Sequence, residues 1–144
     1  MVHLEEYVRD TCIIKFYPVR FKKYPNKFQL LARDNVMQGV VSTSLQVFIQ
    51  QLQRRPNASL GFIASASIIG LVKEEQPNNQ RFRIYKQVME NLFGTMTFAR
   101  FSDETNSAYL MVNRAKGNLQ ESNPRGIDSE LFLYLCCPSK NKTL

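Results

Sequence analysis

Apolar side chains recur every three or four residues in two stretches of the chain, and each stretch predicts an amphipathic helix. The first helix is predicted from residue 36 to about residue 54, on a stripe that consists of Val41, Leu45, Phe48 and Leu52. Pro56 prevents its continuation. The second is predicted to begin after Asn79, which suits a helix N-cap, and to end before Gly94. Its stripe consists of Phe82, Tyr85, Val88 or Met89, and Leu92.

A continuous run of small and apolar residues, Ser59 to Ser67, lies between the two predicted helices. Its length and its bracketing by Pro56 and Gly70 predict a central strand that is buried on both faces. Leu60, Phe62, Ala64 and Ala66 would share one face of that strand. Gly61, Ile63, Ser65 and Ser67 would point the other way. The small side chains of this run would let a helix or a ligand approach closely, and packing of the helices is the simpler of these two explanations.

Four further segments have the β-branched and aromatic content of strands. We predict one hairpin from residues 12–17 and 28–32 around the turn at Tyr24–Lys27, and a second hairpin from residues 95–101 and 108–113. Residues 131–136 would form a last strand or the end of a short helix. Residues 4–10 carry a weak signal for a helical turn, and residues 70–79 read as a polar, mobile loop.

Together these elements predict an α+β fold, with a single mostly antiparallel sheet and two main helices packed on one face. The length of 144 residues fits a single domain, 1–144, in which residues 1–10 and 138–144 are frayed ends.

The chain is basic, with 19 Lys and Arg against 12 Asp and Glu and a net charge of +7. Such a charge favours an anionic partner. Between Thr11 and Arg33 there are six cations and no acid, interleaved with aromatic residues. A surface that follows a nucleic-acid backbone and stacks on its bases has this composition. The alternative is an amphipathic hairpin with its aromatic residues in the core and its cations in water.

Three cations, Arg81, Arg83 and Lys86, occupy the first turns of the second predicted helix. Cations near a helix N-terminus oppose the helix dipole and lower stability, whereas a bound anion would reverse this loss of stability. We therefore predict a nucleic-acid-binding site at Arg81, Arg83 and Lys86, supported by Lys15, Lys22, Lys23 and Lys27. The alternative is that these are solvated surface cations.

The sequence excludes several kinds of chemistry. His3 is the only histidine, which removes Ser-His-Asp, Cys-His and histidine-based metal sites. There is no glycine-rich nucleotide motif, and Cys12, Cys136 and Cys137 suit neither a disulfide framework nor a zinc site. We expect no cofactor and no metal. The absence of a long apolar run or a signal peptide predicts a cytoplasmic protein that does not contact a membrane.

One enzymatic interpretation remains, a metal-independent ribonuclease that works without histidine. Its candidate residues, Arg83, Tyr85, Lys86 and Glu90, lie within two turns of the second predicted helix, but Tyr85 falls on the core stripe.

Two segments carry a resemblance to a known kind of protein: residues 54–67 and the later run Arg81-Phe82-Arg83-Ile84-Tyr85. They resemble small uncharacterised bacterial α+β proteins that have a helix, a Pro-led strand ending in small residues, and an Arg-x-x-x-Tyr helix. Some of those proteins occur in toxin–antitoxin or phage-defence systems, so the resemblance implies a bacterial context. It covers residues 36–93, and the long loop at 68–79 departs from the family's tight turn.

We therefore expect a cytoplasmic domain that binds an anionic macromolecule, RNA or DNA before an acidic protein. The alternative from another class is a non-catalytic interaction module or complex subunit, which would dock through the apolar segment 131–135 and form a homo- or hetero-oligomer.

Overall fold

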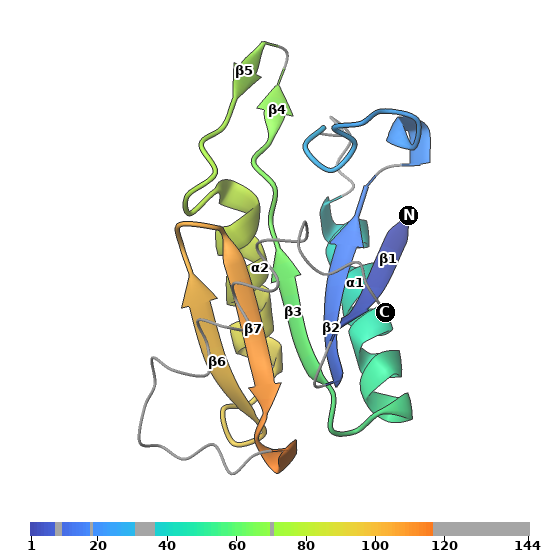
Figure 1. Ribbon diagram of the computed structural model, residues 1–144, viewed down its shortest axis with the longest axis vertical. Helices are drawn as coiled ribbons and strands as arrows, with labels where there is room; N and C mark the ends of the chain where they lie inside the picture. Colours follow the sequence, from blue (N-terminus) through green and yellow to red (C-terminus); the bar gives the residue numbers. More distant parts are fainter. Residues whose placement is uncertain (8–9, 18, 31–36, 70, 117–144) are drawn as a thin grey trace.

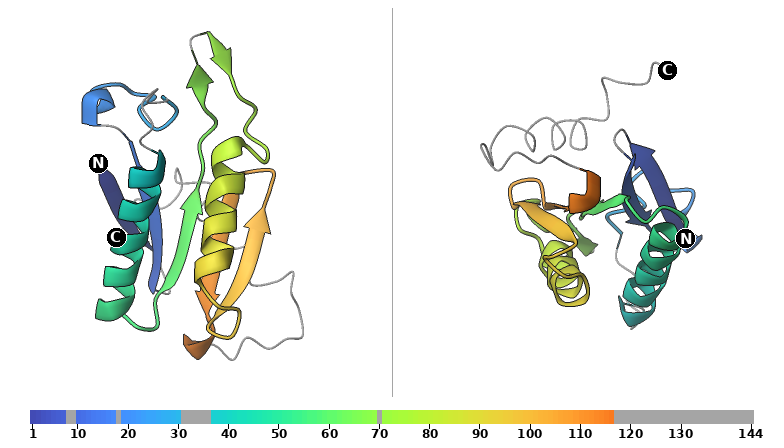
Figure 2. Two further views of the ribbon diagram at one scale, coloured as in Figure 1. Left: turned by 180° about the vertical axis from the view of Figure 1, so that it is seen from behind. Right: turned by 90° about the horizontal axis from the view of Figure 1, so that it is seen from below.

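The fold is α+β, with two helices on one face of a five-stranded mixed sheet (Figures 1 and 2). The computed structural model describes residues 1–7, 10–17, 19–30, 37–69 and 71–116. Its helices are α1 (Met37–Arg54) and α2 (Gln80–Leu92). The sheet consists of β1 (Val2–Tyr7), β2 (Thr11–Phe16), β3 (Ser59–Ile63), β6 (Phe98–Asp103) and β7 (Ala108–Asn113). A separate small hairpin consists of β4 (Ile68–Ile69) and β5 (Val72–Lys73), and two 3-10 helices span Val19–Phe21 and Arg114–Lys116.

The strand order is β1-β2-β3-β7-β6, which places β3 at the centre of the sheet. Strands β2 and β3 are parallel, and every other pair in this sheet is antiparallel. A parallel pair needs a crossover connection, and α1 lies on that connection. The predicted α+β class, the mostly antiparallel sheet and the two helices on one face are confirmed.

Strand β3 is buried on both faces, as its sequence predicts. Leu60, Phe62 and Ala64 belong to the core beneath the helices, where Phe62 lies 5.6 Å from the ring of Tyr85. On the opposite face, the Cα of Gly61 lies so close to β7 that a Cβ there would be 2.8 Å from the carbonyl oxygen of Tyr109.

Two predictions near the N-terminus are wrong. Residues 2–7 form strand β1, paired along its whole length with β2, and not a helical turn within a frayed end. The Met1 ammonium group also donates a hydrogen bond to the Tyr17 carbonyl oxygen. The predicted hairpin between residues 12–17 and 28–32 does not form, because β1 and β3 flank β2. Leu30 instead forms an isolated bridge with Ile68.

The N-terminus of α2 is fixed by a network of buried polar groups. The Asn79 side chain accepts a hydrogen bond from the Phe82 N–H, which confirms the predicted N-cap, and donates another to the Ala64 carbonyl at 2.7 Å. Ser107, in the β6–β7 turn, accepts a bond from the Asn79 N–H and donates one to the Gln76 carbonyl. The network therefore joins the end of β3, the start of α2 and the β6–β7 turn.

The segment 70–79 differs from the loop that we expected. It includes β5, and the Glu74 N–H donates to the Ser67 carbonyl at 2.8 Å. The side-chain amide of Gln76 bonds the backbone of Ala64 and Ala66. These contacts attach the segment to the end of β3.

Several predictions concern residues outside those that the structure describes. They are the strand or helix end at 131–136, the frayed tail at 138–144, and Cys136 and Cys137. Cys12 is a free and fully buried thiol, as expected. Among the described residues, none of the helices is long and apolar enough to cross a membrane.

Candidate functional site

Arg81 points inward from the first turn of α2. Its guanidinium donates hydrogen bonds to the carbonyl oxygens of Phe28, at 2.5 Å, and Leu30, at 3.2 Å. Burial lowers the pKa of Arg81, whereas the nearby Tyr85 and Glu74 act in the opposite direction. Arg81 therefore attaches the segment that ends at Leu30 to the start of α2.

Arg83 and Lys86 lie on a different side of α2. At about 100° per residue, they are about 200° and 140° around the helix from Arg81. Arg83 is exposed and donates a hydrogen bond to the Asn78 carbonyl at 2.6 Å. The Lys86 ammonium lies 3.9 Å from a Glu104 carboxylate oxygen. The structure thus does not bring these two cations and Arg81 onto one surface.

The N-terminus of α2 already has an anionic partner within the chain. A carboxylate oxygen of Glu74 accepts a hydrogen bond from the Gln80 N–H at 2.7 Å, and the other accepts one from the Ser67 N–H. A carboxylate near a helix N-terminus offsets the cost of cations there. The presence of Arg81 and Arg83 in the first turns therefore has an explanation that requires no external phosphate.

The other predicted cations lie in three different environments. The Lys15 ammonium, on β2, forms an ion pair with Glu5 at 2.6 Å. The Lys27 ammonium lies 4.6 Å from the centroid of the Tyr17 ring. Lys22 and Lys23 are exposed and follow the 3-10 helix Val19–Phe21.

We call residues 19–27 the basic loop. It carries Arg20, Lys22, Lys23 and Lys27. Tyr24, at its centre, is 55% exposed and packs edge-on against Phe21. The hairpin itself does not form, but the alternative's placement of aromatic rings in the core is right for Tyr17, which is buried, and wrong for Tyr24.

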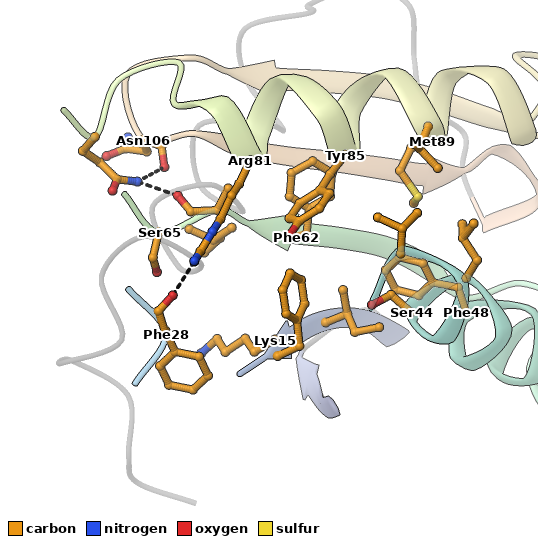
Figure 3. Close-up of a pocket in the computed structure, with 18 residues that line it drawn as sticks. Lys15, Phe28, Ser44, Phe48, Phe62, Ser65, Arg81, Tyr85, Met89 and Asn106 are labelled. Carbon is orange, nitrogen blue, oxygen red and sulfur yellow. Dashed lines mark hydrogen bonds between the residues drawn. The ribbon is translucent and has the colours of Figure 1, made fainter. Parts of the chain in front are cut away.

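A cavity of about 360 Å³ lies between α1 and α2, over β2 and β3 (Figure 3). Its walls are mostly apolar side chains, chiefly Phe16, Val41, Leu45, Phe48, Phe62 and Met89. Polar groups gather at one end, where Arg81 lies near Ser65 in Figure 3 and where Gln76 and Asn106 also line the cavity. The hydroxyl oxygen of Ser44, on α1, is buried and has no hydrogen-bond partner among the described residues.

Tyr85 also lines this cavity, and its environment bears on the ribonuclease interpretation. Burial raises the pKa of Tyr85 to about 12, although the charge of Arg81 acts in the opposite direction. Its phenol is therefore neutral near pH 7 and transfers a proton poorly. Arg83, on the other side of the helix, is exposed to solvent.

Sequence reasoning missed the cavity, although one signal pointed to it. The small side chains of Ala64 and Ser65 predicted a close approach of a helix or a ligand to β3, and both residues line the cavity. Nothing in the local sequence singled out Ser44, and Phe28 stood out only as part of a predicted strand and of the aromatic residues interleaved with cations. The described residues contain no group of three or more His, Cys, Asp or Glu that could hold a metal ion.

Comparison with protein-family models, with curated proteins and with solved structures finds no match to this chain. The resemblance to small bacterial proteins therefore stays a prediction.

Proposed function

We propose that the protein binds single-stranded RNA or DNA through the basic loop. The observation that carries this proposal is that Lys22 and Lys23 are exposed beside the exposed ring of Tyr24. Ammonium groups that contact phosphates, next to an aromatic ring on which a base can stack, are the usual parts of a single-strand binding surface. As part of the same proposal, the protein acts in the bacterial cytoplasm, in a toxin–antitoxin or phage-defence system.

In this proposal Arg81 anchors the loop and does not itself contact phosphate. Its two bonds hold the carbonyls of Phe28 and Leu30, just after the basic loop. A loop fixed at this end loses less conformational entropy on binding than a free segment. Arg83 and Lys86 add positive charge on another side of α2, so they contribute to the long-range attraction of a nucleic acid.

The two alternative functions have less support. The interaction module depends on residues 131–135, which lie outside the described residues. The ribonuclease would need Tyr85 or Glu90 for proton transfer, and the buried phenol of Tyr85 suits that role poorly.

The test is fluorescence anisotropy of a labelled oligouridylate of about 15 nucleotides, titrated with the full chain between about 50 and 200 mM NaCl. We expect the Lys22→Gln/Lys23→Gln double variant to bind more weakly. The slope of log affinity against log salt should become shallower by about 1.4, since each lost contact to a single strand removes about 0.7.

The control is the Arg54→Gln/Arg114→Gln double variant, which removes the same charge from two exposed residues. Arg54 ends α1 and Arg114 begins the 3-10 helix Arg114–Lys116. Figure 1 shows the C-terminal end of α1 and this 3-10 helix at the end of the sheet remote from the basic loop. Equal losses in both variants would show attraction by net charge alone and refute the proposed surface. An affinity that is independent of salt, or equal binding of poly-glutamate, would refute nucleic-acid binding itself.

A further inference from the structure

We propose that the cavity between α1 and α2 binds a small carboxylate with an apolar body, and that Arg81 holds the carboxylate group. This site is separate from the surface proposed for nucleic acid, because the cavity lies on the helix-covered face of the sheet between the two helices.

The size and walls of the cavity suit a small organic molecule. Its volume of about 360 Å³ falls within the range of about 300–1,000 Å³ that is usual for ligand pockets. The walls come from β2, β3, α1 and α2, and include the rings of Phe16, Phe48 and Phe62. An apolar body is therefore the part of a ligand that most of the surface would accept.

Arg81 provides a charged group at one end. Its bonds to Phe28 and Leu30 use only two of its N–H groups. Within the described part of the chain, no carboxylate forms an ion pair with it. Glu74, whose charge it feels, already accepts hydrogen bonds from two backbone N–H groups.

A half-buried guanidinium without an ion-pair partner is costly, and a bound carboxylate would offset that cost. A carboxylate also matches the planar fork of N–H donors that arginine presents. A neutral ligand would leave the charge of Arg81 uncompensated. The chemistry of this end of the cavity therefore favours an anion.

Ser44 marks the opposite end of the cavity. Figure 3 shows Arg81 and Ser44 on either side of the rings of Phe62 and Tyr85. In the part of the chain that the structure describes, the buried Ser44 hydroxyl oxygen has no hydrogen-bond partner, which is uncommon for a buried polar atom. A polar atom on the far end of the ligand body would give this hydroxyl its missing hydrogen bond. Lys15, which also borders the cavity, is already paired with Glu5.

The experiment is isothermal titration calorimetry of the full chain with octanoate, 1-naphthoate and 1-octanol. We expect one molecule of octanoate or naphthoate to bind per chain, and octanol to bind at least about tenfold more weakly, because hydrogen bonds to a charged group are the stronger ones. The two carboxylates distinguish an aliphatic from an aromatic body.

Two variants locate the site. Arg81→Met should weaken octanoate binding by at least about tenfold, whereas Arg83→Met, which removes the same charge from an exposed site on the same helix, should leave it unchanged. Ser44→Leu fills the cavity from α1 without touching the bonds of Arg81, so it should abolish binding of both carboxylates. It also keeps the test valid if Arg81→Met fails to fold.

Three results would overturn the proposal. The first is that neither carboxylate binds the parent chain. The second is that octanol binds as tightly as octanoate. The third is that the folded Ser44→Leu variant, checked by circular dichroism, still binds octanoate as the parent does.

Discussion

Replacement of Gly61 by alanine tests how tightly the centre of the sheet is packed. Gly61 lies on β3, the central strand, and pairs with Leu110 of β7. A Cβ at this position would lie 2.8 Å from the Tyr109 carbonyl oxygen and 2.8 Å from Cδ1 of Ile13. The Ile13 side chain can rotate, but the carbonyl belongs to the backbone of a paired strand. The sheet itself must therefore shift to admit the methyl group.

The expected cost follows from two opposing effects. Loss of glycine's backbone freedom in the unfolded chain would stabilise the variant by about 0.4–1 kcal/mol. Overpacking of a well-packed core costs about 1–3 kcal/mol, and the upper part of that range applies where backbone must move. We therefore expect Gly61→Ala to lower the free energy of unfolding by about 1–2 kcal/mol.

Urea unfolding followed by circular dichroism measures this change. With a denaturant slope of about 2 kcal/mol per molar, the midpoint should fall by about 0.5–1 M. Gly39→Ala is the matched control, because outside the backbone of α1 itself no atom of the described residues lies within 4 Å of a Cβ at this position. It should raise stability by up to about 1 kcal/mol. A Gly61→Ala variant as stable as the parent would refute the close approach of β3 and β7.

Two further predictions concern the start of α2. Asn79→Ala removes both the N-cap and the bond to the Ala64 carbonyl, so it should cost about 2–3 kcal/mol in urea unfolding. Asn91→Ala, at an exposed position near the end of the same helix, should change stability by less than about 0.5 kcal/mol, and equal losses would contradict the network. For Glu74, burial raises the pKa, but the hydrogen bonds from Gln80 and Ser67 outweigh it and place the pKa below its ordinary value of 4.5. The ionised Glu74 carboxylate therefore stabilises the fold above pH 4.5, and this stabilisation is lost as the pH falls through the lower folded-state pKa. Glu74→Gln should be less stable than the parent at pH 7, and the difference in the free energy of unfolding should be smaller at pH 3. A difference that is the same at both pH values would contradict this role.

The elements that sequence reasoning predicted correctly are those with strong local patterns. The stripe of α1, the N-cap at Asn79 and the two-face burial of β3 each depend on residues close together in the chain. Strands β6 and β7 pair across a short polar turn, so their hairpin is also visible locally. For these elements the pattern and the final fold agree in kind, but β3 ends at Ile63 and not at Ser67, and β6 begins at Phe98 and not at residue 95.

Strand β1 and the pairing of β2 could not be predicted in the same way. Only Val2 and Leu4 of β1 pack against the core beneath the helices, and the acidic pair Glu5-Glu6 hides the strand pattern. The turn at residues 24–27 does form, but a turn alone does not decide which strand pairs with β2. That choice depends on β1 and β3, whose pairing with β2 the local pattern does not encode.

The candidate site was hidden for a similar reason. The positive charge at the start of α2 was evident, whereas the direction of each side chain depended on its neighbours. Arg81 turns toward the Phe28 and Leu30 carbonyls, and the Glu74 carboxylate accepts a hydrogen bond from the first N–H group of α2. The cavity requires two helices and two strands in place, so composition alone could indicate only the small residues of its floor.

Arg81 connects the two proposals, and the variants described above separate them. It holds the segment after the basic loop through two carbonyls and also faces the cavity. Arg81→Met removes both functions, so reduced RNA binding in that variant would not identify which was lost. Ser44→Leu changes the cavity alone, and Lys22→Gln/Lys23→Gln changes the loop alone. If Ser44→Leu abolishes octanoate binding and leaves RNA affinity unchanged, the fall in RNA affinity of Arg81→Met reports the attachment of the loop and not the contents of the cavity.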